Sequence, residues 1–281
     1  MLEILQFEFM RNALIAGFLA SLVCGVLGSL VVVNRIVFLS GGIAHAAYGG
    51  IGLSYFMGWP FLAGTIGFSV AGALTMATVG MRAKHRADAI IGVMWAVGMA
   101  IGIVLLDLTP GYRADLISYL FGSILAVSRT DLMLLGVMTA VTISAAALFY
   151  NALLAMAFDE EFSRVRGIPA RALYLGMITL LAVAIVLMIQ IVGLILIIAL
   201  LTIPPYIVEK FTGSLSRMMI WSCVLNVFFT AAGLFVALWL NLTAGACIIL
   251  TAGAGFFLAL VVQRLLPRIT AAGPSTNGGV E

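Results

Sequence analysis

Leu173–Val208 reads LYLGMITLLAVAIVLMIQIVGLILIIALLTIPPYIV, which is 36 residues without a charged side chain. A single helix of that length would measure about 54 Å, at about 1.5 Å per residue. The hydrocarbon core of a bilayer is only about 30 Å thick and takes about 20 residues of helix. A single helix of this length is therefore too long to cross the bilayer once, even when it is tilted. We predict two membrane-spanning helices that turn near Gln190–Gly193.

The rest of the chain has the same character. Of its 281 residues 64% are hydrophobic and 9% are charged, and the mean hydropathy is +1.23. A soluble domain of this size needs several times more charge to cover its surface. A transmembrane β-barrel would show alternating strands of about ten residues, and the sequence lacks that pattern. The predicted fold class is all-α: a polytopic transmembrane helical bundle with eight or nine spans, eight if one is peripheral or re-entrant.

The uncharged runs indicate where along the chain the spans lie, and the positive charges indicate how the spans are oriented across the membrane. With the amino terminus outside, eleven of the fourteen basic residues fall on the cytoplasmic side, as the positive-inside rule favours. We therefore expect a multi-pass protein of the plasma (inner) membrane. Leu116–Val127 is too short to span and is expected to form a short helix at the outer face. The expected spans are 11–33, 38–57, 60–80, 89–106, 132–156, 173–190, 192–208, 218–239 and 243–263.

The chain is expected to form one domain. Residues 1–270 would make a single transmembrane domain, and the Gly/Pro/Ser-rich residues 271–281 a disordered tail. Three cysteines fall inside predicted spans without paired spacing, so we interpret them as small packing residues. They are Cys24, Cys223 and Cys247.

The densest charged segment is Phe158-Asp-Glu-Glu-Phe-Ser-Arg-Val-Arg-Gly-Ile-Pro169. Phe158, Phe162 and Val165 recur at helical spacing, which predicts a short amphipathic helix ending near Gly167. Its acids come first and its bases last, which suits the helix dipole. The charged residues are Asp159, Glu160, Glu161, Arg164 and Arg166. The residues alone leave two interpretations: a solvated loop, or a helix that docks into a groove on a cytoplasmic partner.

His45 is the one histidine inside a predicted span, in the sequence LSGGIAHAAYGG of residues 39–50. An ionisable side chain within the membrane is costly and marks a functional site by default. Neutral imidazole is a common ligand for zinc and related metals. The positions three and four residues away hold no second ligand; they are Gly41, Gly42, Tyr48 and Gly49. Either further ligands come from another span or a second subunit, or His45 is simply hydrogen-bonded within the bundle.

Pro204 and Pro205 interrupt the seventh expected span. Proline lacks a backbone N–H and clashes with the preceding turn, so we expect the helix to kink or break there. Within a bilayer this is tolerated where neighbouring helices or a cavity satisfy the freed carbonyls. The kink could be structural, or it could shape a translocation path.

The sequence holds no recognisable catalytic constellation. A Walker A motif, an HExxH motif and a GxSxG motif are all absent from it. We therefore expect a transport subunit rather than an enzyme.

Six short blocks, in order, resemble the membrane-spanning permease subunits of the zinc/manganese/iron class of ATP-binding-cassette (ABC) importers. The resemblance runs from Phe9 to Gly253. The blocks are Asn34–His45, Ala89–Gly92, Tyr119–Leu125, Phe158–Pro169, Val192–Pro204 and Leu240–Gly245.

The resemblance implies import of zinc, manganese or iron into the cytoplasm by alternating access. It implies a homodimer in membrane lipid, paired with two cytoplasmic ATPase subunits that bind and hydrolyse ATP, and supplied by an extracytoplasmic metal-binding protein. No permanent cofactor and no nucleic acid partner is expected. Segment 158–169 would be the coupling helix that sits in the ATPase groove. His45 matches the histidine of the family's D-x-x-x-H motif, which lines the metal path.

Two positions depart from the family pattern. Gly41 stands where the family usually has the aspartate, and the loss of a hard anionic ligand should weaken manganese binding most. Tyr206 follows Pro204-Pro205, where small residues normally follow a single proline. The first departure favours an alternative cargo, a chelated metal or a small organic solute. An ion-coupled secondary transporter would need paired carboxylates inside the membrane, which the expected spans lack.

Overall fold

Helices form every regular element among the residues that the computed structural model describes, which are 8–83, 86–110, 116–122, 124–158 and 169–265. Their bounds are α1 Glu8–Val33, α2 Val37–Met57, α3 Phe61–Arg82, α4 Ala87–Asp107, α5 Leu116–Phe121, η3 Ile124–Ala126, α6 Arg129–Leu148, α7 Tyr150–Phe158, α9 Ala170–Val192, α10 Leu194–Glu209, α11 Leu215–Leu240 and α12 Ala244–Leu265.

Within these ranges, seven helices are long and apolar enough to cross a membrane. They are α1, α3, α4, α6, α9, α11 and α12. Helix α10 is apolar but has only 16 residues, and α2 has 21 residues but carries His45 and several glycines. The prediction of an all-α multi-pass membrane protein is confirmed.

The uncharged stretch 173–208 folds as two helices, as predicted. Helix α9 ends at Val192 and α10 begins at Leu194, with Gly193 between them at a φ of 88°. Glycine adopts this left-handed backbone without steric cost, which allows the chain to reverse direction in one residue. The short helix expected within residues 116–127 is also confirmed, as α5 and η3.

The single span expected over residues 132–156 is wrong. The chain forms two helices there, α6 and α7, and the helical geometry is interrupted at Phe149, with φ −100° and ψ 13°. No charged residue, glycine or proline marks this point, so the sequence pattern does not reveal the break.

Local capping explains where α6 begins. The Ser128 hydroxyl accepts a hydrogen bond from the Asp131 amide at 3.2 Å, while the Asp131 carboxylate accepts one from the Ser128 amide at 3.1 Å. This reciprocal arrangement satisfies two of the unpaired donors at the start of a helix. Next to it, Arg129 forms an exposed ion pair with Glu8 at 2.7 Å. The first turns of α1 and α6 are thereby held together.

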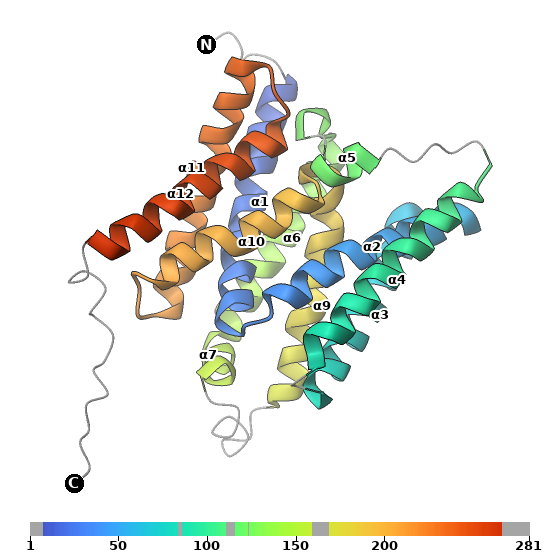
Figure 1. Cartoon of the computed structure of the whole chain (residues 1–281), viewed down its shortest axis with the longest axis horizontal. Helices are drawn as coiled ribbons and strands as arrows, with labels where there is room; N and C mark the ends of the chain where they lie inside the picture. The colour runs from blue at the N-terminus through green and yellow to red at the C-terminus, as the bar shows by residue number, and fades with distance from the viewer. Residues whose placement is uncertain (1–7, 84–85, 111–115, 123, 159–168, 266–281) are drawn as a thin grey trace.

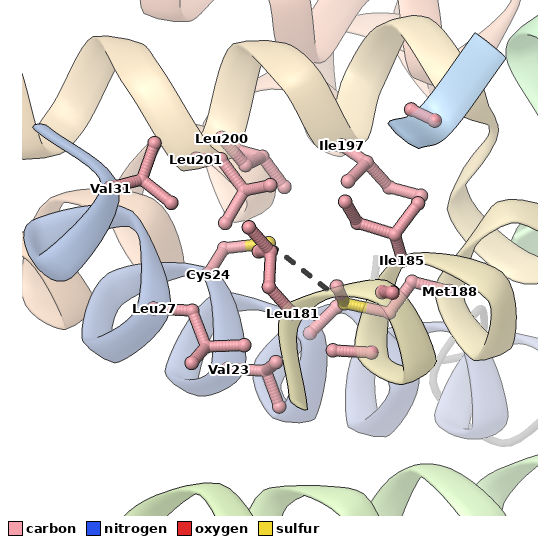
Figure 2. Packing of buried hydrophobic residues seen from close by; sticks show 14 of the residues in the cluster. Val23, Cys24, Leu27, Val31, Leu181, Ile185, Met188, Ile197, Leu200 and Leu201 are labelled. Atoms are coloured by element: carbon pink, nitrogen blue, oxygen red, sulfur yellow. Dashed lines mark hydrogen bonds between the residues drawn. The ribbon is translucent and has the colours of Figure 1, made fainter. Parts of the chain in front are cut away.

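The helices form a central group with a further group at either edge (Figure 1). Helices α2, α3 and α4 lie side by side at one edge, and α11 and α12 lie at the other. Helices α1 and α9 run through the middle, and α10 packs on both of them. Figure 2 shows apolar side chains from α1, α9 and α10 interlocked there, with the Cys24 thiol 3.9 Å from the Met188 sulfur.

The helix order defines two faces of the bundle. We call one the basic face; it carries the α1–α2 turn, the α3–α4 and α10–α11 connections and the start of α9. The α5 face, opposite, carries α5, the start of α6, the α9–α10 turn and the start of α12. Among the described bases, only Arg11 and Arg129 belong to helix ends at the α5 face. At the basic face lie Arg35, Arg82, Arg86, Arg171, Lys210, Arg217 and Arg264.

Candidate metal path

Glycines bring the backbones of α2 and α4 into direct contact. A Cβ atom added to Gly49 would lie 2.6 Å from the carbonyl oxygen of Gly98. One added to Gly52 would overlap the carbonyl oxygen of Gly102. Small residues permit such close crossings in membranes, where no hydrophobic drive holds helices together. His45 lies four residues before Gly49 on α2 and Trp95 three residues before Gly98 on α4, so their rings meet at short range beside this contact.

His45 is half-buried at this crossing and its ring stacks on Trp95. The two ring centroids are 3.9 Å apart with an interplanar angle of 31°. Nδ1 of His45 lies 2.9 Å from the carbonyl oxygen of Gly41, one turn earlier. A carbonyl oxygen only accepts, so Nδ1 carries the proton in this bond and the neutral ring keeps a lone pair on Nε2. His45 is thus hydrogen-bonded within the bundle and still offers one nitrogen to a ligand.

His45 lies well inside the bundle. It follows the first residue of α2, Val37, by eight positions, which corresponds to about 12 Å along the helix from the basic face. The remaining turns of α2, up to Met57, separate it from the α5 face by about 18 Å. An ionisable side chain at this depth is costly, which makes His45 a candidate functional residue.

Gly41 is buried but has free space beside it. The nearest atom to an added Cβ is Cδ1 of Ile198, on α10, at 4.0 Å. This is an ordinary van der Waals separation, so a larger side chain meets no clash at its first carbon. The packing around position 41 therefore does not explain why glycine stands there in place of aspartate.

Within the described part of the chain, no three His, Cys, Asp or Glu side chains gather into a cluster able to hold a metal ion. Among these residues, His45 is consequently an isolated nitrogen ligand.

The cysteines pack as expected. Cys24 contacts Met188, and the Cys223 thiol donates to the carbonyl of Leu22 at 3.5 Å.

A cavity of about 680 Å³ opens at the basic face below His45. Its walls come from the α1–α2 turn, α3, α4, the end of α7 and the start of α9, with Arg35, Asp88 and Arg171 among the lining residues. Phe38 also lines it, and the Phe38 ring lies 5.9 Å from that of Trp95. Ring contacts thus run from the cavity through Trp95 to His45.

Most of the predicted coupling helix lies outside the described residues. Phe158 is the last residue of α7, and α9 begins after Pro169. On either side of the segment, Met156 and Ala170 line the basic-face cavity. The predicted residues outside the described ranges are Asp159, Glu160, Glu161, Phe162, Arg164, Arg166 and Gly167.

Helix α10 continues through Pro204 and Pro205, so the chain does not break there, and the expected alternative of a kink stays a prediction. Two prolines leave the carbonyls of Leu200 and Leu201 without their usual amide partners. Helix α1 closes in at this point: a Cβ added to Gly28 would lie 2.5 Å from the Leu201 oxygen and 2.9 Å from Cγ of Pro205. Helix α1 therefore packs directly against the proline segment of α10.

Tyr206, the second departure from the family pattern, packs toward α12. Its ring centroid is 5.7 Å from that of Phe256, and the Lys210 ammonium lies 4.6 Å above the ring. Its contacts are therefore with the outer edge of the bundle and not with the surroundings of His45.

Sequence reasoning missed two residues that contact the His45 segment. Trp95 stacks on the ring, and no motif signals that contact. Tyr119, on α5, donates a hydrogen bond to the carbonyl of Ala44 at 3.0 Å. Its ring packs edge-on against Tyr48, with centroids 4.6 Å apart. Tyr119 opens one of the six blocks quoted above, but only the folded chain shows what it touches.

Nearly the whole chain matches one known family. The family model described as "ABC 3 transport family" matches residues 6–263. This chain belongs to that family. The chain is 45% identical over 264 residues to the uncharacterized membrane protein slr2045 of Synechocystis, and the match covers 94% of each chain. It is 30% identical over 258 residues to the manganese import system permease protein ScaB of Streptococcus parasanguinis, covering 92% of this chain and 91% of that one.

A solved structure extends the likeness to three dimensions. The chain resembles a chain of PsaBC from Streptococcus pneumoniae, solved in complex with Fab, with a TM-score of 0.85 and 30% identity. The match covers 95% of this chain and 97% of the other. The ABC 3 family protein is thus a membrane permease of the metal-transport class of ABC transporters, and the resemblance drawn from the six blocks is confirmed.

Proposed function

We propose that this ABC 3 permease imports a transition metal, manganese, zinc or iron, into the cytoplasm by alternating access. It would act as a homodimer with two ATPase subunits on the basic face, which would be cytoplasmic. A metal-binding protein would deliver cargo to the α5 face. ATP hydrolysis would take place on the separate ATPase chains, so the permease itself is not an enzyme.

One observation carries the proposal: His45 presents a free ring nitrogen deep in a bundle that matches a manganese import permease over nearly its whole length. Imidazole nitrogen suits zinc and iron, whereas manganese favours oxygen ligands, so for manganese His45 would be one ligand beside several oxygen atoms. Since His45 is isolated within the described chain, the second copy in a homodimer is the natural source of further ligands. A weak and incomplete site also suits transport, because cargo must leave as readily as it enters.

Movement of the two ends of the path would follow from the ATPase cycle. In the proposal, segment 158–169 sits in a groove of the ATPase and moves when the ATPase dimer closes. Its flanks, Met156 and Ala170, line the basic-face cavity, so displacement there would change the width of the cavity directly. The cavity would then be the cytoplasmic exit of the metal.

The coupling role is tested by replacing Asp159, Glu160 and Glu161 together with alanine. We expect the triple variant to lose co-purification with the ATPase, because the acidic start of the segment would carry the docking contacts. A matched control replaces Arg264 and Arg268, at the carboxyl-terminal end, with alanine. Unchanged ATPase association in the acidic variant would remove the coupling assignment.

Transport is tested in vesicles that contain the permease with its ATPase and binding protein. Uptake of radioactive manganese, zinc and iron is compared with and without ATP, for the wild type and for His45→Ala. We expect ATP-dependent uptake of one metal, reduced at least about tenfold by the substitution, since the loss of a residue that merely supports a metal ligand already costs about that much. His85→Ala, at the other histidine of the chain, is the control. Metal uptake that survives His45→Ala unchanged would remove His45 from the path.

Gly41 favours a second candidate cargo, a chelated metal or a small organic solute. Without a carboxylate four residues before His45, the path lacks one hard anionic ligand for a bare ion. The same vesicles distinguish the two cargoes: a chelate importer takes up metal only when the chelator is present and carries both in a fixed ratio.

A further inference from the structure

Helix α5 is held on the α5 face by contacts between backbones. A Cβ added to Gly122, at a φ of 68°, would overlap the backbone of Val192 and Gly193. One added to Gly245, at the start of α12, would lie 2.8 Å from the carbonyl oxygen of Phe121. The end of α5 is therefore seated against the α9–α10 turn and against α12.

From this seat Tyr119 reaches across to α2. Its hydroxyl donates to the carbonyl of Ala44 at 3.0 Å, and Ala44 immediately precedes His45. A helical carbonyl has two lone pairs, so it accepts this bond in addition to its usual amide partner. The bond joins an element of the α5 face to the segment of α2 that presents the candidate ligand.

The Tyr119 and Tyr48 rings also form a layer on the α5 side of His45. Tyr48 is buried, with 3% of its surface exposed, and its ring packs edge-on against Tyr119. It follows His45 by three residues, which places it about 4.5 Å further along the helix toward the α5 face. Aromatic pairs of this geometry add a favourable contact beyond the area that they bury.

We infer that Tyr119 is a positioning residue that holds the α5 side of the path closed above His45. Its hydroxyl fixes the Ala44–His45 segment of α2, and its ring packs with Tyr48 across the route from the α5 face. Cargo would reach His45 from that face when α5 moves and the hydrogen bond and ring contact separate together. This inference deepens the proposed function, because it names the residue that controls access to the same site.

Access to the path can be measured without any transport. Cys24, Cys223 and Cys247 are replaced with alanine, and Gly41→Cys supplies one thiol at a position with room for it. The full-length permease, in right-side-out vesicles with its ATPase, is treated with a membrane-impermeant maleimide. The rate of labelling from the α5 side then reports how often the path opens.

We expect Tyr119→Phe to raise the labelling rate about fivefold, the factor that corresponds to one hydrogen bond of ordinary net strength. Tyr119→Leu, which removes the ring contact as well, should raise it about twentyfold. Tyr150→Phe is the matched control, because the Tyr150 hydroxyl also bonds to backbone, at the Ser216 amide. That substitution should leave the rate unchanged.

Two results would overturn the inference. One is equal labelling in the parent and in both Tyr119 variants, with Tyr119→Phe still folded by size-exclusion chromatography. The other is labelling in the parent as fast as in Tyr119→Leu, since the path would then be open with the tyrosines in place. Failure of the proposed function is separate: the wild-type complex would import none of the three metals, whatever the labelling rates.

Discussion

The central core and the α2–α4 crossing are both buried, yet they are built from different parts of the chain. In the core, long side chains of α1, α9 and α10 interlock, such as Leu27, Leu181 and Ile197 (Figure 2). At the crossing, backbones touch at glycines, and the rings of His45 and Trp95 stack beside that contact. Close packing of large side chains holds the core together. The backbone contacts at the crossing instead fix where His45, Trp95 and the tyrosines lie.

This difference predicts which substitutions affect stability and which affect transport. Volume changes in the core alter packing throughout three helices but leave the His45 surroundings intact. Side-chain changes at the crossing alter one ring or one hydrogen bond, and they should change the binding or transport of the cargo. Changes to the glycines of the crossing should do both, because they separate the backbones that carry the site.

The largest effect is expected for Gly52→Val. The new side chain overlaps the backbone of Gly102, and backbone cannot rotate out of the way, so α2 and α4 must separate. We expect the free energy of unfolding to fall by about 3 kcal/mol and metal uptake to be lost. Thermal unfolding in detergent and vesicle uptake measure the two effects. Gly72→Val, where an added Cβ meets nothing within 4 Å, is the control; equal losses in both variants would contradict the crossing argument.

Leu181→Ala is the corresponding change in the core. Leu181 is 1% exposed, so the substitution leaves a cavity between α1, α9 and α10. We expect a loss of about 2 kcal/mol in unfolding free energy, at the low end for such changes because lipid is itself apolar and only packing is lost. The KM for metal should stay unchanged. Leu250→Ala, at a position 72% exposed, should have no effect on either quantity, and a shifted KM in Leu181→Ala would refute the separation of roles.

Gly41→Asp tests the metal preference of the crossing. The added carboxylate would stand one helical turn before His45, in a space where its Cβ meets no clash. We expect the KM for manganese to fall about tenfold relative to that for zinc, since manganese favours hard oxygen ligands. Competitive uptake of the two metals measures the ratio. Gly41→Asn keeps the shape without the charge, so an equal shift in that variant would argue against a ligand role.

The smallest effect is expected for Trp95→Leu. The substitution removes the ring that stacks on His45 but keeps an apolar side chain on α4. We expect the KM for metal to rise about threefold, the size of one aromatic contact, with little change in unfolding temperature. Uptake at several metal concentrations gives the KM. Trp221→Leu, on the exposed side of α11, controls for the general loss of a tryptophan.

Much of the fold was predictable because membrane helices leave a direct trace in hydropathy. The turn at Gly193 follows from length alone, since one helix cannot contain 36 uncharged residues within a bilayer. The break at Phe149 leaves no such trace, because both α6 and α7 are apolar. The continuity of α10 through two prolines also escapes prediction, because the effect of proline is judged from the local sequence alone and the packing of α1 against this segment is not visible there.

The candidate site was predictable only in part. His45 stands out because an ionisable residue inside a span is rare, and the position of Gly41 follows from the family motif. Trp95 and Tyr119 lie 50 and 74 residues away from His45 in the chain, and no local pattern connects them with it. Their roles depend on which helices cross.

The sequence by itself determined that the chain crosses the membrane many times, which family it resembles, and which histidine falls within an expected span. These properties follow from composition, from the thickness of the bilayer and from the order of short motifs. Only the tertiary structure decided what surrounds His45: a carbonyl on Nδ1, a tryptophan on its face and two tyrosines toward the α5 face. Contacts between distant helices depend on backbone distance, and at this crossing glycines set that distance.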